Sequence, residues 1–242
     1  MRIPRTGFFD WLAIIVAIGI TGCEQTLTPV SLDGTIKVFS ADPHNPIFGK
    51  NSDWVRLGDY DGVSIKSVYE GSVLVLQIKT GEANAAFLRR VNAQLLATPF
   101  LFWSWSVING PPVHPVRLVI GFADEDIEVS DTDNGEIIFG RPRLPPFSRT
   151  LTLVWEGRAL QRGTLSAEPA RRNGKPRARY VVRGGRESRN QWWTESLNLS
   201  RLHSIAWPDV DTTRSRIVFL GISTTGGSLS GTMRIAQFKL SR

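Results

Sequence analysis

The sequence predicts an all-β protein, a single antiparallel β-sandwich of jelly-roll type that follows a cleaved signal peptide. Three observations carry this prediction: short alternating or apolar segments recur along the chain, turn residues separate them, and only one stretch is rich in helix formers. No internal repeat or change of composition marks a second domain, so residues 35–242 are expected to form one sandwich.

The predicted strands follow one another with turn residues between them. In chain order they cover residues 35–39, 54–57, 63–68, 72–78, 101–107, 116–122, 150–155, 178–182, 192–197, 217–222 and 232–240. Residues 58–62 have the glycines and aspartates of a hairpin loop, and the nearly continuous apolar run 72–78 predicts a strand buried on both faces. Residues 83–95 fit a helix or a strand, and the β surroundings favour a strand.

The strand that contains Trp103 and Trp105 is expected to lie at the centre of the core. With period two, Leu101, Trp103, Trp105 and Val107 share one face, and the opposite face is more polar. Each indole can bury on the order of 200 Å². An exposed sugar-stacking platform is the alternative, but the aliphatic neighbours favour the core.

The amino terminus has the features of an export signal. Positive residues come first, an apolar stretch runs from Trp11 to Ile20, and small residues precede Cys23. As a helix this stretch is only about 15 Å long, half of the roughly 30 Å hydrocarbon core of a bilayer, so it is a poor membrane span. Residues 1–22 are therefore expected to be removed as a lipoprotein signal peptide.

Cys23 is the only cysteine of the chain and is expected to carry a lipid. The sequence Ile20-Thr21-Gly22-Cys23 resembles a bacterial lipobox, in which a diacylglyceryl group is attached to the cysteine and cleavage leaves that cysteine first. An ordinary buried cysteine after an apolar helix is the alternative. More than one acyl chain gives stable anchoring, so residues 23–34 are expected to be a lipid-anchored tether. Glu24 favours the outer membrane, with the domain facing the periplasm.

The charge balance favours anionic partners. The chain has 29 Lys and Arg against 22 Asp and Glu, a formal net charge of +7. Such a charge predicts affinity for polyanions such as lipopolysaccharide phosphates, acidic glycans or anionic lipid. Because an exported protein does not meet nucleic acid, none is expected as a partner.

Several short motifs follow one another in an order that resembles a known family. They are Thr98-Pro99, Trp103-Ser104-Trp105, Arg117 to Phe122, Leu153-Val154-Trp155, Gly163-Thr164, Trp192-Trp193 and Gly221-Ile222. This order is similar to that of an uncharacterised family of exported bacterial proteins, a domain of unknown function. The resemblance implies a jelly-roll sandwich and export, and it implies no activity. Residues 112–115 and 223–228 depart from the acidic segments that the family tends to carry there.

A basic segment between Arg158 and Arg189 is the strongest functional lead. Lys175, Arg177, Arg179 and Arg183 share strand parity and are expected to line one face, with Ala178, Tyr180 and Val182 on the other. Guanidinium groups suit phosphate or carboxylate ligands. A solvated strand that protects the sheet edge with its charges is the alternative.

Two acidic segments offer weaker leads. Asp124, Asp126 and Glu128 would share a face if the preceding strand continued, as the paired carboxylates of a glycosidase require, and a solvated strand end is the alternative. Residues 131–136 supply oxygen ligands for calcium or form an ordinary turn. No cofactor, metal motif or nucleophile motif is recognisable.

Three functions follow from these leads. The favoured one is a non-catalytic envelope protein that binds an acidic glycan or another polyanion through the basic face. A glycan-active hydrolase or lyase using Asp124, Asp126 or Glu128 is the second. A structural envelope-assembly lipoprotein with a protein partner is the third.

Overall fold

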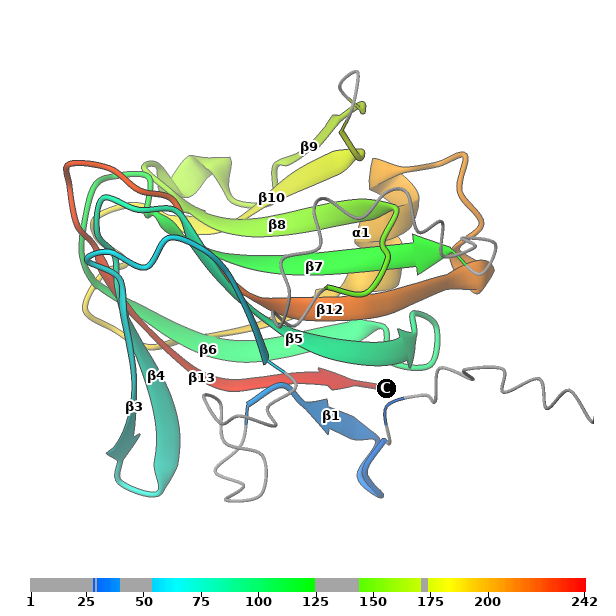
Figure 1. Cartoon of the computed structure of the whole chain (residues 1–242), viewed down its shortest axis with the longest axis horizontal. Helices are drawn as coiled ribbons and strands as arrows, with labels where there is room; N and C mark the ends of the chain where they lie inside the picture. Colours follow the sequence, from blue (N-terminus) through cyan, green and yellow to red (C-terminus); the bar gives the residue numbers. More distant parts are fainter. Residues whose placement is uncertain (1–27, 29, 40–53, 125–143, 171–173) are drawn as a thin grey trace, which may run out of the picture.

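The computed structural model describes residues 28, 30–39, 54–124, 144–170 and 174–242, which form two packed β-sheets (Figure 1). The six-stranded sheet has the order β11 (Trp193–Asn198), β6 (Phe100–Asn109), β13 (Thr232–Ser241), β4 (Val73–Lys79) and β3 (Ser64–Glu70), with β1 (Thr35–Lys37) paired to β13. The seven-stranded sheet has the order β2 (Trp54–Gly58), β5 (Ala85–Gln94), β12 (Ser215–Thr224), β7 (Val116–Asp124), β8 (Arg149–Glu156), β10 (Arg177–Gly184) and β9 (Leu165–Glu168).

The predicted jelly-roll sandwich is confirmed. The chain passes repeatedly from one sheet to the other, for example from β5 to β6, from β6 to β7 and from β12 to β13. The described strand pairs are antiparallel except for β8 and β10, which run parallel. A parallel pair needs a crossover connection, and here the crossover carries the 3₁₀-helix η2 (Ala159–Gln161) and strand β9.

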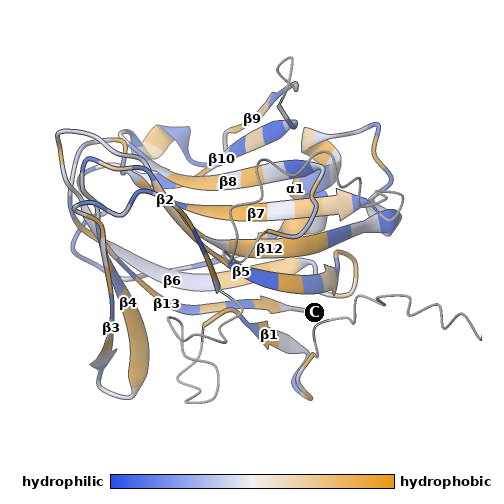
Figure 2. Cartoon of the chain, viewed as in Figure 1, coloured by the Kyte–Doolittle hydropathy of each residue, from blue (hydrophilic) through white to orange (hydrophobic). Residues whose placement is uncertain are grey.

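Three tryptophans form the centre of the core, as the sequence predicts for two of them. Trp103, Trp105 and Trp155 are each 0% exposed. Trp105 makes edge-to-face contacts with both of the others, with ring centroids 5.6 Å apart in each pair. Aromatic pairs of this geometry contribute about 0.5–1.5 kcal/mol beyond the area that they bury. Figure 2 shows the apolar residues along β7, β8 and β12 that complete this core.

Residues 83–95 contain strand β5, so the prediction of a strand there is confirmed. The prediction of a hairpin at residues 58–62 is wrong. β2 pairs with β5 and β3 pairs with β4, so this loop crosses between the sheets. The run 72–78 is buried on both faces only at Val75 and Leu76, because Val73 and Gln77, on the same face as Val75, are exposed.

The helix α1 (Leu199–Ala206) is an element that the sequence analysis did not predict. It begins directly after β11, where the Asn198 side chain accepts a hydrogen bond from the Arg201 backbone N–H at 2.9 Å. Leu199, Leu202, His203 and Ala206 are its buried residues. The short 3₁₀-helix η3 (Thr212–Arg214) then leads into β12. α1 therefore attaches one end of the six-stranded sheet to the ends of β7 and β8.

Candidate functional site

The four predicted basic residues do not share one face. Arg177 and Arg179 lie on the outer face of the seven-stranded sheet, turned away from the other sheet, because Ala178 between them packs into the core. A β-bulge just before Arg183 shifts the register, so Arg183 pairs with the inward-facing Trp155. The prediction that Arg183 shares a face with the other three is therefore wrong, because strand parity holds only while the pairing is regular.

Lys175 lies just before β10 and contacts an apolar cluster on the outer face. Its ammonium group is 4.1 Å from the centroid of the Phe147 ring, which itself packs edge-to-face on Phe219 of β12. A cation over an aromatic ring contributes about 0.5–1 kcal/mol at exposed sites. Lys175 therefore covers apolar surface and places a positive charge near Arg177.

Arg179 is ion-paired with Glu156 of β8. In the register, Arg179 lies opposite Thr152, and Glu156 is two outward-facing positions further along β8. The Arg179 side chain therefore runs along the sheet past Val154 to reach the carboxylate. Val154 is only 1% exposed although it faces outward, as expected beneath a long aliphatic stem.

Arg117 of β7 is a site residue that the sequence analysis did not select. It lies on the same outer face, next to the Leu118–Leu153 pair. Burial, and then the positive charge of Arg179, lower the pKa of Arg117 from its usual value. Its Nε atom is buried and makes no hydrogen bond with the described residues. The available sequence signal was an arginine within an otherwise hydrophobic strand.

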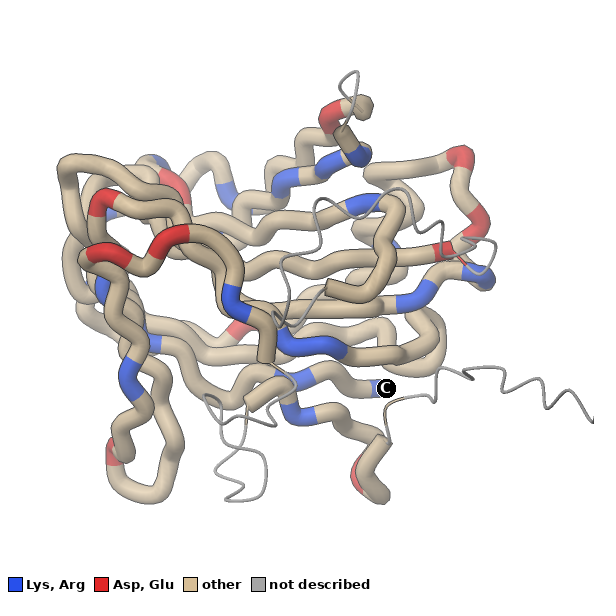
Figure 3. Tube along the Cα trace, in the orientation of Figure 1, with Lys and Arg blue, Asp and Glu red and all other residues tan. Residues whose placement is uncertain are grey.

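These residues form the outer basic face, which we define as Arg117, Lys175, Arg177 and Arg179. Figure 3 marks the Lys and Arg positions along β10 in blue. The guanidinium groups of Arg117 and Arg179 lie close enough to repel each other, and Glu156 is ion-paired with Arg179. An additional anion on this face would reduce the repulsion and accept hydrogen bonds from the guanidinium groups.

Arg183 lies between the two sheets instead. Its Nε–H donates to Oε1 of Glu195 at 2.6 Å, and its guanidinium is 3.7 Å from the centroid of the Trp193 ring. Arg162 donates to Oε2 of the same carboxylate at 3.4 Å. Because Glu195 is only 5% exposed and both oxygens accept hydrogen bonds, this group connects β10 to β11 and does not offer a free carboxylate.

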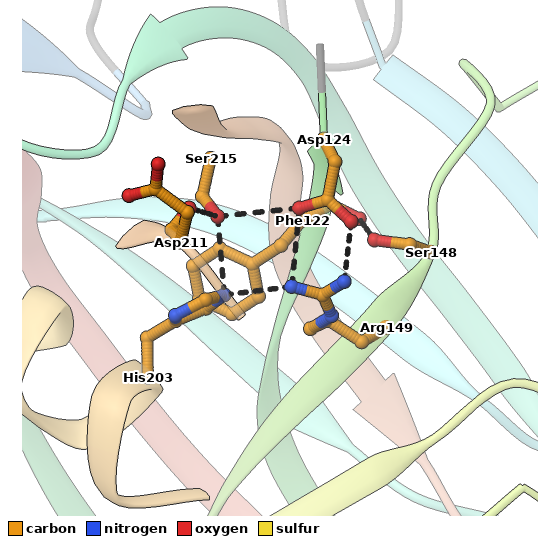
Figure 4. A network of polar contacts seen from close by, with 7 residues as sticks. All are labelled: Phe122, Asp124, Ser148, Arg149, His203, Asp211 and Ser215. Atoms are coloured by element: carbon orange, nitrogen blue, oxygen red, sulfur yellow. Dashed lines mark hydrogen bonds and ion pairs between the residues drawn. The ribbon is translucent and has the colours of Figure 1, made fainter. Parts of the chain in front are cut away.

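Asp124, the first of the predicted catalytic residues, is held in a polar network at the end of β7 (Figure 4). Arg149 of β8 binds it with both terminal nitrogens, with Nη1 3.1 Å from Oδ1. Ser215 of β12 donates to the same Oδ1 at 3.3 Å. The carboxylate is therefore engaged in structural contacts. Asp126, Glu128 and the calcium-or-turn segment 131–136 lie outside the described residues.

His203 of α1 joins this network through Nε2. A guanidinium can only donate, so Arg149 Nη1–H donates to His203 Nε2 at 3.1 Å. The proton of the neutral ring is therefore on Nδ1. Burial, and then the charge of Arg149, lower the pKa of His203 to about 4, while Asp124 opposes the shift. The Ser215 hydroxyl is 3.4 Å from Nε2, but Ser215 is fully buried and Nε2 is already an acceptor. The arrangement is therefore not an acyl-transfer site.

The predicted lipidation site, Cys23, lies outside the described residues, so its modification stays a prediction. Within the part of the chain that the structure describes, no helix has the length and apolar character needed to cross a membrane. In the same residues, no group of three or more His, Cys, Asp or Glu side chains is placed to hold a metal ion.

No protein-family profile and no curated protein matches the sequence. Among solved structures, a family 12 xyloglucanase from Bacillus licheniformis is 10% identical, with a TM-score of 0.45 over 86% of this chain and 99% of that one. The family 12 endoglucanase 3 of Trichoderma harzianum is 9% identical, with a TM-score of 0.42 over 75% and 85%. A family 11 carbohydrate-binding module from Clostridium thermocellum is 10% identical, with a TM-score of 0.41 over 87% and 96%. Similarities this low carry no argument about ligand or activity.

Proposed function

We propose that the protein is a lipid-anchored envelope protein that binds an acidic glycan or another envelope polyanion without catalysis. The observation that supports the proposal is the outer basic face, where Arg117 and Arg179 are brought together over Val154. Arginine presents a planar fork of donors that matches carboxylate and phosphate groups.

A polymer suits this face better than a single small anion. Arg177 and Arg179 are successive outward positions on β10, and Arg117 is on β7, with β8 between them. Outward positions on one strand are about 6.6 Å apart, so the cations are spread along and across the sheet. A glycan with a charged group on each repeating unit can contact several of them at once, and each contact adds salt-sensitive affinity.

The proposed anchor would hold the sandwich close to the membrane. Within the predicted tether, the Thr28 backbone N–H donates to the Asn92 carbonyl of β5 at 2.9 Å, and the Asn92 N–H donates to Thr28 Oγ1 at 2.7 Å. Even fully extended, the chain from Cys23 to Thr28 spans no more than about 17 Å. A lipid on Cys23 would therefore keep the sandwich near envelope glycans and lipopolysaccharide, in our proposal on the periplasmic side of the outer membrane.

The two alternatives differ from this proposal in what they require. A glycan hydrolase or lyase would depend on Asp126 and Glu128, since the Asp124 carboxylate is bound by Arg149. A structural assembly lipoprotein would need no glycan and would give a protein partner in crosslinking. The charge arrangement of the outer basic face favours the binding function over both.

The test uses the full chain in detergent, with immobilised polygalacturonate and lipopolysaccharide as probes and methyl-esterified polygalacturonate as the uncharged control. We expect binding to the two anionic probes that falls steeply with salt. Arg117→Gln and Arg179→Gln should each weaken it about tenfold, since a hydrogen bond to a charged group contributes roughly 1.5–3 kcal/mol. Lys66→Gln removes one exposed positive charge from the six-stranded sheet and is the matched control.

Equal binding to esterified and free polygalacturonate would remove the acidic-glycan function. Anionic binding that Lys66→Gln weakens as much as Arg179→Gln would show an unspecific charge effect and no defined face. Arg177→Gln gives a further check, because Arg177 is exposed and its substitution does not disturb the core.

A further inference from the structure

A pocket of about 260 Å³ lies at the edge of the seven-stranded sheet opposite to β9 and β10, where β2 and β5 face the start of β3. Its lining residues are Arg56, Tyr60, Val63, Ser64, Ile65 and Phe87. The loop 58–62 supplies one wall because it crosses between the sheets and does not close a hairpin. The pocket is therefore a product of the crossover that the sequence analysis did not predict.

Two aromatic rings form one side of this pocket. The Tyr60 and Phe87 rings meet edge-to-face, with centroids 5.2 Å apart and planes at 61°. Phe87 is part of the central core, whereas Tyr60 is half-buried and packs against that core. The core therefore fixes the position of both rings. Rigid aromatic walls of this kind, combined with a few polar groups, are typical of small-molecule sites.

Arg56 provides the positive charge of the pocket. It pairs in register with Phe87, so both side chains are on the inner face of the sheet. Its guanidinium carbon is 6.0 Å from the Tyr60 centroid and 5.9 Å from the Phe87 centroid. The guanidinium group thus lies beside both rings, and Ser64 adds a hydroxyl that donates or accepts.

We propose that this pocket binds a single sugar ring that carries a carboxylate, with the ring against Tyr60 and the carboxylate on Arg56. Pockets for drug-sized ligands usually measure about 300–1,000 Å³, so this smaller volume suits one ring better than an oligosaccharide. An arginine fork gives a carboxylate two parallel hydrogen bonds that a neutral hydroxymethyl group does not reproduce. The site faces the opposite sheet, so it is separate from the outer basic face and does not depend on it.

Saturation-transfer NMR on the full chain in detergent tests the proposal, with D-glucuronate as the probe and D-glucose as its uncharged counterpart. We expect saturation of the glucuronate ring protons and a signal from glucose at least several-fold weaker. Arg56→Gln should weaken glucuronate binding about tenfold, since the lost contact is a hydrogen bond between charged groups. Tyr60→Ala should abolish the signal, and Tyr60→Phe, which keeps the ring, should retain it.

Circular dichroism of each variant distinguishes lost binding from unfolding. Arg56→Gln is informative even if Tyr60→Ala fails to fold. Arg201→Gln, at an exposed position of α1 outside both the pocket and the outer basic face, should leave the glucuronate signal unchanged. Equal signals from glucose and glucuronate would overturn the role of Arg56. A glucuronate signal that persists in both Arg56→Gln and Tyr60→Ala, or no signal in the parent protein, would overturn the site.

Discussion

Arg183 of β10 donates its Nε–H to Oε1 of Glu195 on β11 across 2.6 Å, and this ion pair connects the two sheets of the sandwich. Neither side chain is well solvated, since the exposed fractions are 11% and 5%. The Trp193 ring covers the guanidinium from one side. A charge left alone at this position would therefore lack both water and a counterion.

Glu195→Ala should lower the free energy of unfolding by about 3–5 kcal/mol, because it leaves Arg183 nearly buried without its carboxylate. Replacing both residues with apolar ones, as Arg183→Met with Glu195→Leu, should recover much of that loss. Urea unfolding of the parent, the two single variants and the double variant measures the coupling free energy between Arg183 and Glu195. Arg162→Ala is the control and should cost less than about 1 kcal/mol, since Arg162 is 58% exposed.

Periodicity in the sequence was sufficient to predict the sandwich and its tryptophan core. Trp103 and Trp105 are buried because alternate strand residues point to one face, and that rule depends only on local geometry. The same rule failed at Arg183, because a bulge changes the face of every residue that follows it. No local sequence pattern around Arg183 predicts the bulge.

The contacts of the candidate sites depend on strand pairing, which the sequence does not specify. Arg117 and Arg179 are distant in the chain and come close only because their strands, β7 and β10, both pair with β8. The pocket around Tyr60 required knowing that β2 and β3 belong to different sheets. Glycines and aspartates mark a turn at residues 58–62, but they do not determine whether the turn closes a hairpin or crosses the sandwich.

Gly121→Ala should destabilise the fold, because a Cβ at Gly121 would be 2.2 Å from the ring of Phe219. That ring is 1% exposed and packs on Phe147, so it cannot move away without loss of contacts. We expect a loss of about 1–3 kcal/mol in the free energy of unfolding, the usual cost of overpacking. Gly227→Ala is the matched control, since nothing lies within 4 Å of its Cβ position. An equal effect at both positions would contradict the steric explanation.

Lipidation of Cys23 predicts that the protein incorporates labelled palmitate and sediments with the membrane fraction. Cys23→Ser removes the thiol that accepts the diacylglyceryl group, so both the label and the membrane association should be lost. Because the sandwich itself is unchanged, the Cys23→Ser protein should keep its circular dichroism spectrum. Label that persists in Cys23→Ser would show that another residue carries the lipid.

Two buried histidines predict a loss of stability in mild acid. His114 and His203 are both 0% exposed, and the pKa of each is lowered from 6.5 to about 4, mainly by burial. The Asn109 carbonyl accepts from His114 Nε2–H at 3.1 Å, and the Val116 N–H donates to Nδ1 at 3.2 Å, so the neutral ring is fully bonded. At His203, the facing charges are Arg149 and Asp124.

The unfolded chain binds a proton on each histidine below about pH 6.5, whereas the folded chain does so only near pH 4. Their contribution to stability is therefore complete above pH 6.5 and is lost as the pH falls toward 4, by roughly 3 kcal/mol per histidine. His203→Gln keeps an acceptor for Arg149 but does not titrate. Urea unfolding across this pH range should show a shallower decline for His203→Gln than for the parent. Parallel declines would mean that His203 keeps an ordinary pKa in the folded protein. The buried network with Arg149 would then not be a cause of the acid-induced loss of stability.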